Sequence, residues 1–103
     1  MKYTIDTKKS LFEPLELVVD GVTYKSLEIL DHEYLKKSNE LNRATIEDYN
    51  VDASLELIEL TFPGLTREKT KTIDIRVRRE IAEFVSEALI HPQKKEKAKK
   101  KTK

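Results

Sequence analysis

Residues 14–25 follow the two-residue period of a β-strand on both sides of a tight turn. The apolar positions that carry the period are Leu15, Leu17, Val19, Val22 and Tyr24. Asp20-Gly21 separates the two runs. A type I′ turn needs positive φ at both central residues, which Gly adopts without steric cost and Asp tolerates. The pattern therefore predicts a β-hairpin.

Helical spacing replaces the strand period after the hairpin. An apolar stripe contains Leu30, Tyr34 and Leu41. Asp31 precedes the first full turn of this stripe, and its short carboxylate suits the position that caps a helix N-terminus. A first helix is therefore predicted over residues 31–43.

A second apolar stripe continues at spacings of three and four. It consists of Ile46, Tyr49, Ala53, Leu57 and Leu60. Two alternatives remain open for this segment. Either Thr45 caps one continuous helix, or residues 50–52 interrupt it and Asp52 caps a shorter helix that ends near Phe62. Pro63-Gly64 stops the helix in both cases, because Pro disrupts the hydrogen-bond ladder and Gly permits a turn.

Two further elements follow the Pro-Gly stop. Residues 66–72 are polar and predict one short helical turn capped by Thr66. Asp74 then caps a final amphipathic helix that ends at His91-Pro92. Its apolar face is formed by Val77, Ile81, Phe84, Val85, Ala88 and Leu89. On the polar face, the pairs Arg76–Glu80 and Arg79–Glu83 are one turn apart and are expected to interact.

The element order predicts an α+β fold, in which an N-terminal hairpin is followed by a bundle of three to four helices. No repeat with a period of 20 to 50 residues is visible. Before the hairpin, residues 1–13 show little pattern beyond the alternation of Tyr3 and Ile5, so a strand and a loose arm are both compatible with them. The predicted organisation is an arm over 1–13, a single domain over 14–92 and a disordered basic tail over 93–103.

Charge is distributed unevenly between domain and tail. The 103 residues carry a net charge of +1, but residues 93–103 hold seven of the twenty basic side chains and one acid. Residues 1–92 therefore have a net charge of −5. There is no cysteine, no long apolar run and no apolar core near the start that would resemble a secretion signal. A soluble cytoplasmic protein is expected.

The sequence offers little that is typical of catalysis or cofactor binding. The two histidines, His32 and His91, lie far apart and in no motif, so neither is expected to bind metal or act as a base. The two glycines, Gly21 and Gly64, cannot form a phosphate-binding or dinucleotide-binding loop. A non-enzyme without cofactor or metal is expected.

The lysine-rich tail has two interpretations. Lysines neutralise phosphates and so give salt-sensitive binding to nucleic acid, whereas the same composition is typical of a solubilising disordered end. The tail has no aromatic residue to stack on bases and no Arg for bidentate readout, and the domain is acidic. Nucleic acid is therefore an unfavoured partner.

The element order and three short motifs resemble the tail assembly chaperones of long-tailed bacteriophages. The motifs are the hairpin of residues 17–24, the helix that runs into Phe62-Pro63-Gly64 followed by Leu65-Thr66, and the Ile73-Asp74 cap of the closing helix. The resemblance covers residues 15–90. It implies a helical protein that acts by binding.

The resemblance implies particular partners in the host bacterial cytoplasm. They are the tape measure protein and the tail tube protein, with a homo-oligomer as a further expectation and no membrane association. The candidate partner-binding residues are Tyr34, Leu41, Tyr49, Phe62, Phe84 and Leu89. As members of apolar stripes, they also fit a core position, which the pattern favours over an interface for each of them. The alternative functions are a small protein-interaction adaptor and a nucleic-acid-associated protein with a basic tail.

Overall fold

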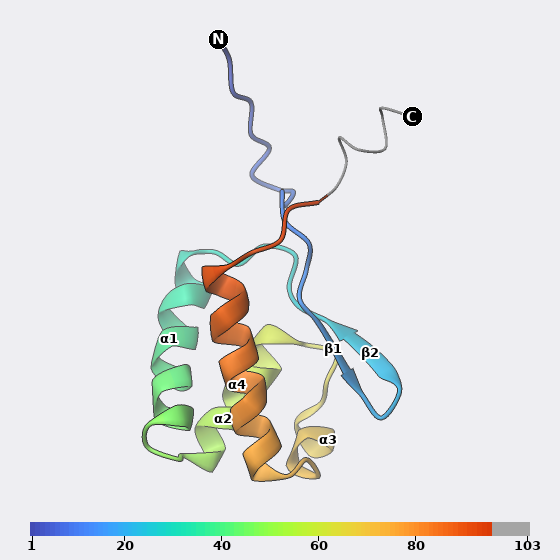
Figure 1. Ribbon diagram of the computed structural model, residues 1–103, viewed down its shortest axis with the longest axis vertical. Coiled ribbons are helices and arrows are strands. Elements are labelled where there is room, and N and C mark those ends of the chain that lie inside the picture. The colour runs from blue at the N-terminus through green and yellow to red at the C-terminus, as the bar shows by residue number, and fades with distance from the viewer. Residues whose placement is uncertain (96–103) are drawn as a thin grey trace.

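A two-stranded hairpin and four helices form the domain (Figure 1). The computed structural model describes residues 1–95. The elements are β1 (Glu16–Val19), β2 (Val22–Lys25), α1 (His32–Ile46), α2 (Val51–Thr61), α3 (Arg67–Lys71) and α4 (Ile75–Ile90). Helices α1, α2 and α4 pack against one another, and the hairpin lies on the side of the bundle away from α1. The predicted α+β fold is confirmed.

The hairpin forms as its alternating pattern predicts. Asp20 and Gly21 both have positive φ, 52° and 81°, as a two-residue type I′ connection requires. This turn places Leu17 opposite Tyr24. Cross-strand partners share one face of the pair, and Leu17, Val19 and Tyr24 all pack against the helical core. The hairpin is therefore attached by one apolar face.

Helix α1 begins as predicted and ends later. The Asp31 carboxylate accepts a hydrogen bond from the Tyr34 N–H at 3.0 Å. The helix then continues past residue 43 to Ile46. It includes Thr45, which is buried and whose hydroxyl donates to the Leu41 carbonyl at 2.8 Å. Thr45 therefore lies inside α1 with its hydroxyl hydrogen-bonded to its own helix, and the prediction that it caps a second helix is wrong.

Helices α1 and α2 are separate, in agreement with the alternative in which residues 50–52 interrupt the segment. The cap of α2 is Asn50, whose side-chain oxygen accepts from the N–H groups of Asp52 at 3.0 Å and Ala53 at 3.1 Å. Asp52 is not the cap. It lies in the first turn of α2, where its negative charge interacts favourably with the positive end of the helix dipole.

The two predicted caps after the Pro-Gly turn are confirmed. Thr66 accepts from the Lys69 N–H at the start of α3, and Asp74 accepts from the Arg76 N–H at 2.7 Å at the start of α4. The Arg76 guanidinium also binds the Asp74 carboxylate. These contacts hold the pKa of Asp74 well below its usual value.

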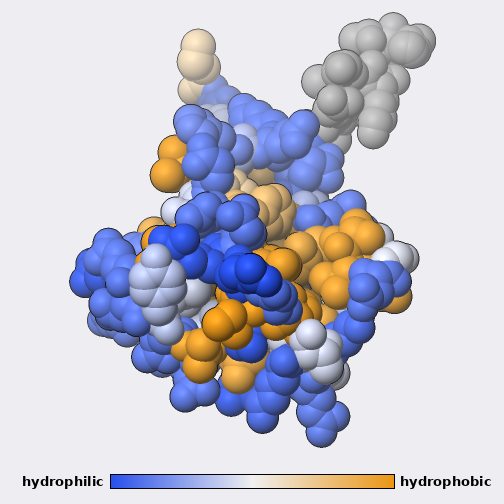
Figure 2. Space-filling model, turned by 60° about the horizontal axis from the view of Figure 1, so that its bottom comes forward, coloured by the Kyte–Doolittle hydropathy of each residue, from blue (hydrophilic) through white to orange (hydrophobic). Residues whose placement is uncertain are grey.

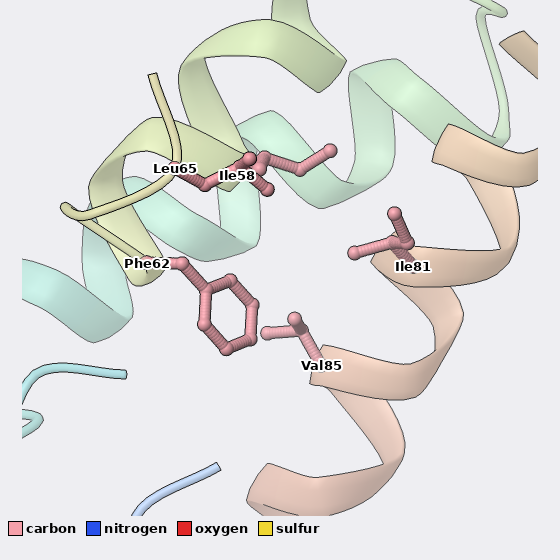
Figure 3. Close-up of a cluster of buried hydrophobic side chains, with 5 residues drawn as sticks. All are labelled: Ile58, Phe62, Leu65, Ile81 and Val85. Carbon is pink, nitrogen blue, oxygen red and sulfur yellow. The ribbon is translucent and has the colours of Figure 1, made fainter. Parts of the chain in front are cut away.

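The core has two parts that share α2 and α4. One part contains Ile58, Phe62, Leu65, Ile81 and Val85, which point toward one another between α4, α2 and the loop after α2 (Figure 3). The hairpin packs on this part. The other part contains Leu41, Ala53, Leu57 and Ala82 and joins α1 to the same two helices. Each of α2 and α4 therefore buries more than one side.

Residues 11–13 pair with residues 93–95. Within residues 1–15 no strand of the hairpin type forms, but Phe12 pairs with Lys94 in an antiparallel bridge. The Glu13 N–H donates to the Gln93 carbonyl at 2.7 Å, and the Lys95 N–H donates to the Leu11 carbonyl at 3.0 Å. The predicted disordered tail thus begins with paired residues, and its remainder, 96–103, lies outside the described residues.

Candidate partner-binding groove

A groove of about 720 Å³ lies between the C-terminal half of α4 and the segments that enter and leave the hairpin. Half-buried or exposed apolar side chains form much of its lining, including Leu15, Leu27, Leu30, Phe84, Ala88 and Leu89. The volume falls in the range of ~300–1,000 Å³ typical of binding clefts. The groove can therefore accept several side chains of a partner.

Ser26 fixes the wall that the hairpin contributes. Its N–H donates to the Leu15 carbonyl at 2.8 Å, and its hydroxyl accepts from the Leu15 N–H at 3.0 Å. The same hydroxyl donates to the Leu27 carbonyl at 3.0 Å. The Leu27 N–H in turn donates to Thr61 at the end of α2. These bonds hold Leu15 and Leu27 against the bundle, although neither belongs to a named strand.

Glu28 joins the groove to both end segments. One carboxylate oxygen accepts from the Ser10 N–H at 3.3 Å and lies 3.4 Å from the Lys95 ammonium. The Ser10 hydrogen bond, followed by the contacts with Lys95, lowers the pKa of Glu28. Ser10 and Glu28 both line the groove, together with Phe12. The paired segments 10–13 and 93–95 therefore form its rim.

The charged residues that line the groove are mostly acidic. They are Glu13, Glu16, Glu28 and Lys94. Their formal sum is −2, and two of the acids contact lysines outside the lining, Glu28 with Lys95 and Glu16 with Lys25. An apolar floor with an acidic rim favours an apolar partner segment that carries basic residues.

The six predicted partner-binding residues occupy three different environments. Phe84 and Leu89 line the groove, whereas Tyr49 lies at another corner of the molecule. Tyr34, Leu41 and Phe62 are buried in the core. Buried side chains cannot contact a partner on this surface, so the fold brings together only two of the six.

Tyr34 illustrates why a buried residue of this set is structural. Its hydroxyl lies 2.8 Å from the Thr61 hydroxyl, which itself donates to the Leu57 carbonyl at 2.9 Å. Because the Thr61 proton is already used, Tyr34 is the donor in this pair. The bond connects α1 to α2. Burial raises the pKa of Tyr34.

Sequence reasoning missed the groove residues that lie outside the helices. Phe12 and Leu27 line it, yet neither belongs to a periodic run long enough to predict its environment. Leu30 also lines it, although the sequence pattern placed Leu30 in the stripe of the first helix. The available signal was the apolar content of the connection over residues 27–30, which is high for a loop that leaves a surface hairpin.

A second, smaller hollow of about 340 Å³ lies where α1 ends and α4 begins. Tyr49 occupies this corner with a φ of 53° and is 70% exposed. The Arg79 guanidinium lies 4.9 Å from the centre of its ring and donates through Nε and Nη2 to the Ile46 carbonyl. Arg79 thus connects α4 to α1.

The arginines of α4 do not form the predicted pairs. Among the described residues, neither Arg76–Glu80 nor Arg79–Glu83 comes within salt-bridge distance, since Arg76 binds Asp74 and Arg79 turns to Ile46. Tertiary acceptors and the helix cap compete with exposed partners one turn away, whose contribution is small.

Arg78 is buried between α2 and α4 with 7% of its surface exposed. It donates to the Ser54 hydroxyl at 3.1 Å and to the carbonyls of Val51 and Ile73 at 3.3 and 3.2 Å. No carboxylate in the part of the chain that the structure describes pairs with it. Neutral oxygens therefore satisfy this buried cation, and it lines neither hollow.

Apolar side chains are also exposed away from the groove. Figure 2 shows apolar surface near the lower ends of the helices and, at the right, over the hairpin. Exposed apolar residues of these elements include Val18, Val22, Val51, Ile75 and Val77. Val51 and Ile75 line the smaller hollow, whereas Val18, Val22 and Val77 line neither hollow.

No helix in residues 1–95 is long and apolar enough to cross a bilayer. Over the same range, no group of three or more His, Cys, Asp or Glu side chains is arranged to hold a metal ion.

Comparison with known proteins gives no relative: no protein-family model, curated protein or solved structure matches this chain.

Proposed function

We propose that this protein is a tail assembly chaperone of a long-tailed bacteriophage, acting by binding and not by catalysis. Its partners in the host bacterial cytoplasm are the tape measure protein and tail tube subunits. The groove beside α4 is the observation that carries the proposal. The hairpin and helix motifs that resemble this family support the choice of partner.

The groove suits a chaperone because it offers apolar contacts at an exposed position. Phe84 is 39% exposed at its edge, so its ring is available to a partner without unfolding of the domain. Aromatic side chains with pockets beside them commonly dominate binding energy at interfaces. An apolar helix of a long partner would place a few side chains in the groove, and the acidic body would keep the complex in solution.

Binding of the full chain to a tape measure fragment tests the proposal. The change is Phe84→Ala, and its matched control is Leu35→Ala, because Leu35 is an exposed apolar residue of α1 that does not line the groove. We expect the Phe84 variant to bind about tenfold more weakly, a typical effect for an interface aromatic, and the control to bind like the parent. Calorimetry would measure both.

Two results would contradict this function. The parent chain could fail to bind tape measure fragments and tail tube subunits, which would remove the proposed partners. Equal weakening by Phe84→Ala and Leu35→Ala would show that the groove is not the binding surface. Circular dichroism of both variants establishes that the domain remains folded in these measurements.

A further inference from the structure

We propose that the arm over residues 1–9 of one copy occupies the groove of a second copy, so that two chains exchange arms. This self-association needs no other partner. It goes beyond the proposed function, and only one consequence rests on that function: a tape measure segment and the arm would compete for the same groove.

The arm has the pattern of a ligand for an apolar groove. Tyr3 and Ile5 are 76% and 56% exposed, and they alternate with Lys2, Thr4 and Asp6. In an extended conformation this alternation places Tyr3 and Ile5 on one side of the chain. Figure 1 shows the arm running away from the domain. Its apolar side therefore remains uncovered within one copy.

The charges of the arm and the groove are complementary. Residues 1–9 contain Lys2, Lys8 and Lys9 against Asp6, which gives their side chains a formal sum of +2. The side chains that line the groove sum to −2. Opposite net charges favour this pairing, whereas a second acidic surface would be repelled.

The geometry favours a second copy over the same copy. The Asp6 carboxylate accepts from the Lys8 N–H at 3.0 Å, and the Asp6 carbonyl accepts from the Lys9 N–H at 3.1 Å. This turn directs residues 1–5 away from the domain. Ser10, the next residue, is held on Glu28 at the rim of the groove. Reciprocal exchange between two copies makes two identical contacts and closes the assembly.

The size of the groove agrees with this occupant. A volume of about 720 Å³ accepts a few side chains, such as an aromatic and one or two aliphatic groups. Tyr3 and Ile5 supply that set from one extended segment. Phe84 and Leu89, exposed or half-buried at the groove, would gain contacts from both.

Sedimentation equilibrium of the full chain tests the exchange. We expect a reversible dimer in the parent and a monomer in a variant lacking residues 2–9. The double change Tyr3→Ser and Ile5→Ser should weaken the dimer by about tenfold or more. Added salt should weaken the dimer of the parent chain, because it screens the charges of arm and groove. Leu35→Ser is the matched control, because it removes an exposed apolar side chain outside the groove, and it should leave the dimer unchanged.

A spin label separates exchange from binding within one chain. The chain has no cysteine, so Thr4→Cys gives a single attachment site. Spin-labelled copies that carry no isotope are mixed with ¹⁵N-labelled copies that carry no spin label. Broadening of the amide signals of Phe84, Ala88 and Leu89 in the ¹⁵N copies would support exchange. Broadening of these signals only when label and isotope share one chain would overturn it.

The outcome for self-association is distinct from that for the proposed function. A parent chain that stays monomeric, or a dimer that survives loss of residues 2–9, overturns the exchange whether or not tape measure binds. Failure of tape measure binding leaves the dimer measurement unaffected. If both ideas hold, removal of residues 2–9 should strengthen binding of the tape measure fragment, because the competing arm is gone.

Discussion

Two adjacent faces of α4 have the same apolar character but different surroundings. Val85 is 1% exposed, whereas Phe84, its neighbour in the chain, is 39% exposed and lines the groove. Ile81 resembles Val85, and Leu89 lies between these extremes. The amphipathic pattern of a helix shows which residues are apolar, but it does not show which of them another element will cover.

The difference follows from what packs on each face. Phe62 and Leu65, from the end of α2 and the loop after it, cover Ile81 and Val85 (Figure 3). The opposing wall near Phe84 consists of the segments that enter and leave the hairpin and of the paired end segments. A dense core therefore lies beside an open groove on one helix. Substitutions in the core and in the groove should differ in their effect on the free energy of unfolding.

The largest loss of stability is expected from a substitution in the core that covers Ile81 and Val85 of α4. Phe62→Ala removes a side chain that is fully buried, so the lost burial and the remaining cavity should lower the free energy of unfolding by about 3–5 kcal/mol. Phe84→Ala should lower it by less than ~1 kcal/mol, because its ring is already partly hydrated. Urea denaturation measures both. Similar losses would show that the groove is part of the core.

A second change tests the cation buried beside the covered face. Arg78→Met keeps an apolar stem of similar length but removes the donors to Ser54 and to the carbonyls of Val51 and Ile73. The Ser54 hydroxyl and the Ile73 carbonyl lose a donor, whereas the Val51 carbonyl still accepts from the Ser54 hydroxyl at 2.7 Å. We expect a loss of about 1–3 kcal/mol in the free energy of unfolding. An unchanged midpoint in urea would argue that water replaces the lost donors.

The change Tyr34→Phe should lower the free energy of unfolding by a smaller amount, and its effect should depend on pH. Tyr34→Phe removes the buried hydrogen bond to Thr61 and should cost about 1 kcal/mol at neutral pH. Because burial raises the pKa of Tyr34 above its ordinary value of 10.0, the unfolded chain ionises first. The stability linked to this group is present below pH 10 and is lost as the pH rises through the folded pKa.

Denaturation at pH 8 and pH 11 measures this linkage for Tyr34. The parent should lose more stability than Tyr34→Phe between the two pH values, since only the parent has the buried phenol. Equal losses in the two proteins would assign the alkaline effect to other groups.

The smallest effect is expected at the open corner that contains Tyr49. A tyrosine at positive φ is strained, and glycine would relieve about 1 kcal/mol of that strain. The change also removes the stacking of Arg79, which is worth about 0.5–1 kcal/mol at an exposed site. We therefore expect Tyr49→Gly to stay within about 0.5 kcal/mol of the parent.

Tyr49→Ala serves as the control, because it loses the ring but keeps the strain. It should be about 1 kcal/mol less stable than Tyr49→Gly in the same urea titrations. A ranking with alanine above glycine would show that the loop changes conformation when the ring is absent.

Local signals in the sequence predicted the elements well. Asp20-Gly21, Asp31, Thr66 and Asp74 act through their own backbone or through N–H groups two or three residues away, so a short stretch of sequence determines their role. The cap of α2 was predicted wrongly, because Thr45 and Asp52 were the two candidates and the structure uses Asn50. The backbone of the loop between α1 and α2 determines which side chain reaches the first N–H groups of α2.

The candidate site was less predictable because it depends on contacts between distant segments. The stripes of α1, α2 and α4 made Tyr34, Phe62 and Phe84 equally plausible partner-binding residues, and burial then separated the first two from the third. Phe12 and Leu27 entered the lining through hydrogen bonds to residues far away in sequence. No periodicity within residues 1–13 or within the connection over residues 27–30 encodes such contacts.

The antiparallel bridge between Phe12 and Lys94 has a topological consequence. It places Leu11 and Lys95 within hydrogen-bonding distance, so a short linker between them would turn the fold into a closed ring. A circularly permuted chain could then open at Thr72, in the connection between α3 and α4, where the backbone is exposed. In such a chain the segment order would run from α4 through the linker to the hairpin, with the packing of the bundle preserved.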